Sequence, residues 1–210
     1  MKTIKHIILA ISFILLVSGG LFPSFGQGED IFYETYTRGE VISALDPSDR
    51  FFTLVTVDPG ERESAVIGVF DKSNRDKVFS YLEDKSFLKK LPVDLVFAPG
   101  PQGGTDLKSL YALKLPGSLK VPRKSDIQTV TLEEGNREGT FDVLLSFKGE
   151  GGDKWAALTR ANQGRSIAIV IGEEVVSAPR VMAEIKFGKC RISGNFSISE
   201  ATRISNVLME

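Results

Sequence analysis

The expected architecture follows from one segment, Asp153-Lys-Trp-Ala-Ala-Leu-Thr-Arg-Ala-Asn162, which runs on into Gly164-Arg-Ser-Ile-Ala-Ile-Val-Ile171. Trp155 and Leu158 share one face of a helix that Asp153 would cap and Gly164 would end. The residues that follow, 166–171, form an apolar run with the length of a strand. We therefore expect a helix that is followed directly by a buried strand.

Short apolar runs, turns and two further helices surround this segment. The last helix starts at Ser197, which forms a capping box with Glu200. An earlier helix over 73–83 has the same type of box, from Ser73 and Asp76. This pattern predicts an α+β fold of mostly antiparallel sheets with helices packed on one face. The expected strands are 31–45, a hairpin of 51–57 with 64–70, then 93–98, 110–115, 127–132, 141–147, 175–176, 181–187 and 190–196.

The chain divides into four expected parts. Residues 1–26 are an export signal, 27–115 an N-terminal α+β part, 116–126 a linker and 127–210 a C-terminal α+β part. The linker is assigned from its two prolines and one glycine, which interrupt the regular patterns on either side.

The signal has a basic start, Lys2, Lys5 and His6, followed by an apolar stretch over 7–17. Small residues then precede a cleavage site between Gly26 and Gln27. We expect an exported, periplasmic protein without a stable membrane span after cleavage. An uncleaved N-terminal segment that anchors the chain is the alternative.

Composition excludes several function classes. The 26 basic residues balance 27 acidic ones, for a net charge of −1 among 210 residues, so no overall positive field attracts nucleic acid. The one histidine lies in the predicted signal, so the exported chain has no histidine for a catalytic triad or a zinc site. The one cysteine, Cys190, shares strand parity with Ile192 and Phe196, which predicts a buried, inert thiol; a reactive or intermolecular thiol is the alternative.

Acidic pairs such as Glu133 with Glu134 and Glu173 with Glu174 occur in predicted turns. Paired carboxylates can hydrolyse glycosides or hold calcium, but spacing alone does not place two of them around one substrate or ion. We expect solvated turns, with no catalytic residue, no metal site and no cofactor.

The C-terminal third resembles a known family. Its motifs are the helix that ends in Thr159-Arg-Ala-Asn162, the strand and turn from Gly164, then Ser177-Ala178-Pro179 and Ile192-Ser-Gly-Asn-Phe196 before the last helix. They are similar to the head of the first periplasmic domain, the P1 head, of the protein-export membrane subunit SecD and of fused SecDF proteins. Weaker similarity extends upstream to residue 51. The resemblance implies a head domain that engages translocating polypeptide.

Two departures from the family matter. Family members carry several transmembrane helices, whereas no later segment here has transmembrane length, so we expect a stand-alone copy without the motor. The usual Asp-Gly turn is replaced by Gly172-Glu173, which suits a type II′ rather than a type I′ hairpin.

The resemblance favours an exported, non-enzymatic accessory module that contacts translocating or unfolded polypeptide, or an envelope or translocon protein. A structural protein of the envelope unrelated to export is the second hypothesis, and a hydrolase without histidine is the third. The expected contacts are strand edges and apolar surface, where glycines allow close backbone approach. The candidate binding residues are Ser177, Ala178, Pro179, Arg180, Gly188, Arg191 and Gly194.

Overall fold

The computed structural model describes residues 29–101, 106–117 and 120–210. The predicted signal and its cleavage site at Gly26 and Gln27 lie outside these residues. The described part contains nine strands, six α-helices and two short 3₁₀ helices. In chain order they are β1 (Phe32–Glu34), α1 (Arg38–Ile42), α2 (Phe51–Leu54), β2 (Val66–Asp71), η1 (Lys72–Asn74), α3 (Arg75–Leu82), α4 (Lys85–Leu88), β3 (Leu95–Pro101), β4 (Leu107–Lys114), η2 (Lys124–Asp126), β5 (Ile127–Glu134), β6 (Phe141–Phe147), α5 (Glu150–Ala161), β7 (Ile167–Ile171), β8 (Glu174–Ser177), β9 (Lys189–Phe196) and α6 (Ile198–Met209).

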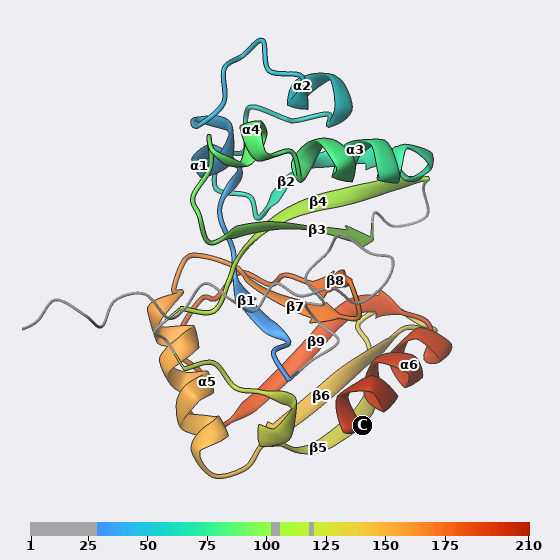
Figure 1. The fold of residues 1–210 in the computed structure, drawn as a ribbon. Helices are drawn as coiled ribbons and strands as arrows, with labels where there is room; N and C mark the ends of the chain where they lie inside the picture. Colours follow the sequence, from blue (N-terminus) through green and yellow to red (C-terminus); the bar gives the residue numbers. More distant parts are fainter. Residues whose placement is uncertain (1–28, 102–105, 118–119) are drawn as a thin grey trace, which may run out of the picture.

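The strands form three antiparallel sheets with the orders β2-β4-β3, β1-β7-β8 and β5-β6-β9. Figure 1 shows them in layers, with β7 and β8 between the other two sheets. Helices α1 to α4 lie at the outer side of the first sheet, and α6 packs on the third. The α+β class, with mostly antiparallel sheets and helices on one face, is confirmed.

Strand β7 is the centre of the molecule because both of its faces are buried. Ile167, Ile169 and Ile171 point into the core shared with β6, β9, α5 and α6, whereas Ala168 and Val170 pack against β3 and β4. All five side chains are at most 3% exposed. An uninterrupted apolar run is the pattern expected of a strand covered on both faces, so the predicted strand at 166–171 is confirmed.

Strand β1 pairs with a strand that lies far along the chain. It pairs with β7 in the register Phe32↔Ile169 and Glu34↔Ile167, although more than 130 residues separate the partners. Thr35 forms an isolated bridge with Leu113 at the end of β4. The N-terminal segment therefore lies in a sheet that the C-terminal part mainly builds. The predicted division at 116–126 stays a prediction.

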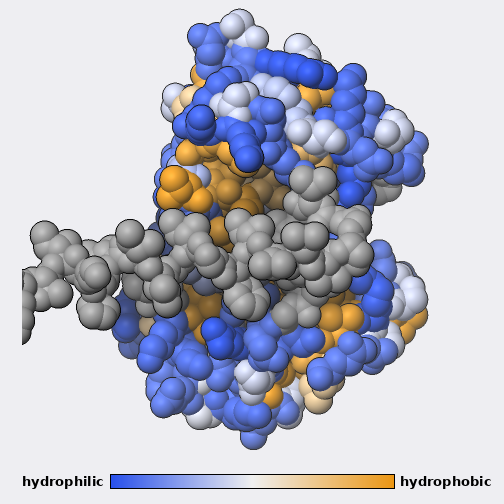
Figure 2. Space-filling model, in the orientation of Figure 1, coloured by the Kyte–Doolittle hydropathy of each residue, from blue (hydrophilic) through white to orange (hydrophobic). Residues whose placement is uncertain are grey.

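Most hydrophilic residues of the face in Figure 2 lie over the outer layers. Apolar residues gather between the upper and lower parts of that view, where the first sheet approaches the second. No helix within the described ranges has the length and apolar character that a membrane crossing needs.

The predicted strand 51–57 is wrong, since Phe51 to Leu54 form helix α2. The Asp49 carboxylate accepts the Phe51 amide at 2.8 Å, and Phe51 stacks on Phe87 of α4 with ring centroids 6.0 Å apart. Packing against α4 thus overrides the strand preference of aromatic residues. Of the predicted hairpin with 64–70, an isolated bridge between Thr56 and Val69 is present.

The predicted long strand 31–45 is also wrong beyond Glu34. Thr37 and Glu40 form a capping box that starts α1, with Thr37 N donating to Glu40 Oε2 at 2.7 Å. Arg38, 5% exposed, turns inward and donates to the carbonyls of Val66, Ile67 and Asp58. These bonds hold the irregular start of β2 against α1.

Two predicted caps are wrong, and one is confirmed. Asp71 caps η1 ahead of α3, in place of the expected box of Ser73 with Asp76. Helix α5 begins after Gly149, whose φ of 50° suits glycine, so Asp153 lies inside the first turn. The box of Ser197 with Glu200 at the start of α6 is present as predicted.

Candidate functional site

The residues singled out from the sequence lie along β8, the connection 178–188 and β9, which we call the β8–β9 surface. Strands β8 and β9 are each the last strand in the order of their sheet. They meet where Ser177 Oγ donates to the Ser193 carbonyl at 2.9 Å. Two strands that end their sheets therefore meet at this surface. An edge strand is the element that an added extended segment pairs with.

Ser177 to Arg180 continue the chain past the end of β8. Ala178 packs partly against the cluster around Val170 and Val175. The Pro179 carbonyl accepts the Ile167 amide at 3.2 Å, and Arg180 forms a bridge with Ser166, so this backbone is held against β7. The side chains of Pro179 and Arg180 remain exposed.

Gly188 and Gly194 are required by contacts within the chain. Gly188 has a φ of 56°, and a Cβ there would lie 3.1 Å from the Cα of Gly152 in α5. A Cβ on Gly194 would overlap the ring of Phe196. Both glycines thus allow other parts of the same chain to lie close to their backbone. That a second chain also lies close to them stays a prediction.

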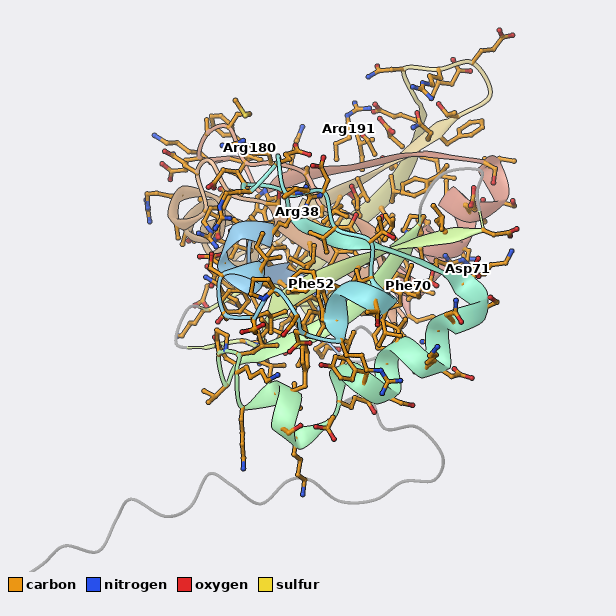
Figure 3. The ribbon with its side chains drawn as sticks, turned by 90° about the horizontal axis from the view of Figure 1, so that it is seen from above. Arg38, Phe52, Phe70, Asp71, Arg180 and Arg191 are labelled. Atoms are coloured by element: carbon orange, nitrogen blue, oxygen red, sulfur yellow. The ribbon has the colours of Figure 1, made fainter. Side chains whose placement is uncertain are left out.

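Arg191 lies in an ion-pair cluster on the exposed face of the third sheet. Its guanidinium contacts Glu133 of β5 at 2.7 Å and Asp142 of β6 at 3.1 Å. Both hydrogen bonds raise the pKa of Arg191, so its charge is satisfied within the sheet. Figure 3 shows Arg180 and Arg191 toward the same edge of the molecule, away from α3 and α4.

The sequence analysis missed the most exposed apolar side chains of this surface. Met182 is 83% exposed and Phe187 88%, and Ile185 between them is 39% exposed. The predicted strand 181–187 is wrong, because the Ile185 amide donates to Thr159 Oγ1 of α5 and Glu184 pairs with Arg160. Side chains of helix α5 thus hold residues 184 and 185 where a neighbouring strand was expected. No local pattern in 181–187 indicates these contacts with α5.

Cys190 is buried beneath this surface, as its parity predicted. It is 6% exposed in the core with Ile192 and Phe196. Burial raises the pKa of its thiol to about 12, so the thiolate that reacts with oxidants and metals is scarce at neutral pH.

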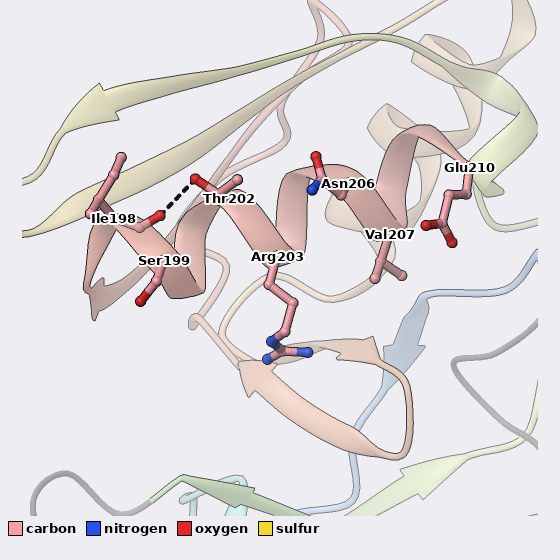
Figure 4. A pocket seen from close by; sticks show the side chains of 7 residues that line it. All are labelled: Ile198, Ser199, Thr202, Arg203, Asn206, Val207 and Glu210. Atoms are coloured by element: carbon pink, nitrogen blue, oxygen red, sulfur yellow. Dashed lines mark hydrogen bonds between the residues drawn. The ribbon is translucent and has the colours of Figure 1, made fainter.

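A shallow groove of about 610 Å³ runs along α6. Figure 4 shows its lining, in which the one bond drawn joins Thr202 Oγ1 to the Ile198 carbonyl within the helix. The lining residues belong to α6 and to its C-cap Glu210, so the groove is one open helix face and does not gather groups from several elements. They are Ile198, Ser199, Thr202, Arg203, Asn206, Val207 and Glu210.

Across 29–101, 106–117 and 120–210, no three histidine, cysteine, aspartate or glutamate side chains are grouped so that they could hold a metal ion. The acidic pair Glu173 and Glu174 contacts Arg75 at 3.5 Å and Lys108 at 2.8 Å, respectively. These carboxylates thus join the β7–β8 turn to α3 and β4.

Comparison with known proteins confirms the resemblance for the C-terminal part. Residues 121–210 match the family described as "SecDF, P1 head subdomain". The protein translocase subunit SecD of Sebaldella termitidis is 41% identical over 107 residues, which are 50% of this chain and 26% of that protein. SecD of Elusimicrobium minutum is 32% identical over 123 residues, 59% of this chain and 24% of that protein. The matched segment thus spans about a quarter of each relative.

Two solved structures are also similar to the chain. A SecDF structure described as the "super-membrane-facing form" has 26% identity and a TM-score of 0.41, covering 66% of this chain and 16% of that one. A second, described as a "membrane component SecDF that enhances protein export", has 19% identity and a TM-score of 0.39, covering 85% of this chain and 92% of that one.

Proposed function

We propose, from the premise that residues 121–210 match the SecDF P1 head subdomain family, that this chain is a non-enzymatic periplasmic module that binds extended polypeptide during protein export. The relatives are protein translocase subunits. This role belongs to the relatives and supports the proposal for this chain.

The observation that carries the proposal is the exposure of Met182 and Phe187 on the connection between β8 and β9, the two strands that end their sheets. Single exposed apolar side chains are common, but several on one short connection, as Met182, Ile185 and Phe187 are, indicate a contact surface. An extended segment can pair its backbone with a strand edge whatever its sequence, and its apolar side chains can then cover Met182, Ile185 and Phe187.

Binding of this kind is weak. Ordering a flexible segment offsets much of the contact free energy, so we expect dissociation constants at micromolar levels or above. Weak binding suits a surface that must release each segment as it moves.

Photo-crosslinking tests the proposal. A photoreactive residue at 182, 187, 177 or 180 should form adducts with an unfolded exported protein, whereas one at the exposed Lys77 on α3 should not. Adducts from these positions to one folded envelope protein, with none to the client, would support a structural role in the envelope and overturn the proposal.

A double variant gives an independent test. Met182→Ser with Phe187→Ser removes apolar surface that the fold does not use, so the melting temperature should stay unchanged while client binding weakens at least fivefold. The matched control is Val93→Ser, which alters a fully exposed apolar side chain on the turn before β3. Equal loss of binding in the control would contradict the assignment of the surface.

A further inference from the structure

The β8–β9 surface carries exposed basic side chains next in sequence to its exposed apolar ones. Arg180, Lys186 and Lys189 are exposed and lie within two residues of Met182 or Phe187 in the sequence. Lys148 is exposed at the end of β6, next to the bond from the Phe147 amide to the Gly188 carbonyl. None of these four cations has an ion-pair partner within the described residues.

The acidic groups nearby do not cancel this charge. Glu184, the one acid of the loop, is bound by Arg160 at 3.2 Å and its side chain is 20% exposed. Glu150 and Asp153 lie in the first turn of α5, where the helix dipole favours negative charge. Four unpaired cations against these two carboxylates leave a local positive excess on a chain whose net charge is −1.

We propose that this surface selects extended segments in which apolar residues alternate with acidic ones, and disfavours basic segments. This inference rests on the proposed function and names its substrate class. Charges within a Debye length of about 8–10 Å add attraction or repulsion to an apolar contact, and in protein interfaces such complementarity sets specificity and association rate. A segment lying over Phe187 comes within that range of Lys186 and Lys189, its neighbours in sequence.

An anionic lipid surface offers a similar mixture of apolar and negative groups. The observations favour polypeptide because β8 and β9 also present strand edges, which pair with a backbone and have no use for a lipid. The lipid is therefore one outcome of the test.

Three labelled peptides of equal length provide the probe. They share alternating Val, Leu and Phe residues and differ in the intervening positions, which are all Glu, all Ser or all Lys. Fluorescence anisotropy with the full chain at 50 mM NaCl should show the Glu peptide binding about tenfold more tightly than the Ser peptide, with the Lys peptide weakest. At 500 mM NaCl the three affinities should converge, because salt screens exposed charges.

Charge reversal locates the effect. Lys186→Glu with Lys189→Glu should remove or invert the preference while leaving the melting temperature unchanged. The matched control, Lys85→Glu with Lys89→Glu on and after α4, changes the same net charge at exposed positions far along the chain, and should retain the preference.

The outcomes separate the two proposals. If all three peptides bind equally, and the double variant Met182→Ser with Phe187→Ser abolishes this binding, the proposed function is kept and acidic selection is overturned. Binding of no peptide would overturn both. Binding to phosphatidylglycerol vesicles together with no peptide binding would assign the surface to lipid and likewise overturn both.

Discussion

Helices α2 and α6 each follow a polar residue, but they form for different reasons. Helix α6 has twelve residues, a complete capping box and an apolar stripe of Ala201, Ile204 and Leu208. Helix α2 has four residues and no side-chain cap bond, and Phe51 is its one buried side chain. Helix α6 is specified within its own sequence, whereas α2 forms because Phe51 stacks on Phe87 of α4. The comparison separates local from tertiary control of secondary structure.

The largest effect is expected where tertiary control is strongest. Phe51→Ala should lower the free energy of unfolding by about 4 kcal/mol, because it leaves a cavity beneath α2 next to Phe87. Urea unfolding measures the loss, and hydrogen exchange should show α2 unprotected while α6 keeps its protection. Loss of protection in α6 to the same extent would contradict the separate control of the two helices.

Asp49 provides the second test, since its carboxylate holds the turn before α2. Burial alone would raise the pKa of Asp49, but hydrogen bonds from Lys90, Tyr81 and the Phe51 amide outweigh it and hold the pKa below its ordinary value. This stabilisation is present above the unfolded pKa of about 3.9 and is lost as pH falls through the lower folded value. Asp49→Asn should lower the free energy of unfolding by about 2 kcal/mol at pH 7. It should also make the free energy of unfolding depend less on pH in the acid range.

The pH profile is measured by urea unfolding between pH 2 and 7. Asp46→Asn is the control, because Asp46 lies in the same turn but bonds to exposed Ser48 alone. An acid limb in Asp49→Asn as steep as in the parent chain would contradict the role of this carboxylate.

Removing the cap of α6 should cost less. Ser197→Ala deletes the acceptor of the Glu200 amide and should lower stability by about 1 kcal/mol, with fraying confined to the first turn. Ser205→Ala, which removes the same kind of hydroxyl from the middle of α6, serves as the control. A cost near that of Phe51→Ala would show that α6 also depends on distant packing.

The smallest effect concerns Cys190. Its thiol should react with a disulfide reagent no faster than the protein opens, because it is buried and its pKa is raised to about 12. Labelling rates should rise with urea in step with unfolding. Rapid labelling under native conditions would place Cys190 outside the core.

Local patterns alone were sufficient for the centre and the C-terminal end of the fold. These patterns are the apolar run of β7, the capping box of α6 and the strand parity of Cys190. In each of them the neighbours in sequence are enough to predict whether a side chain is buried or caps a helix. Their predictions are confirmed because a strand buried on both faces and a long capped helix have few alternative structures.

Distant contacts decided the remaining elements and the exposed surface. Phe51 is helical because Phe87 and Asp49 hold it, and 181–187 is a loop because Thr159 and Arg160 of α5 bind it. In both cases the sequence pattern is compatible with a strand, and the partner that overrides it lies more than 20 residues away along the chain in α4 or α5. The exposure of Met182 and Phe187 follows from the same contacts, because a sequence pattern reports which residues are apolar, and only the tertiary structure settles which of them are covered.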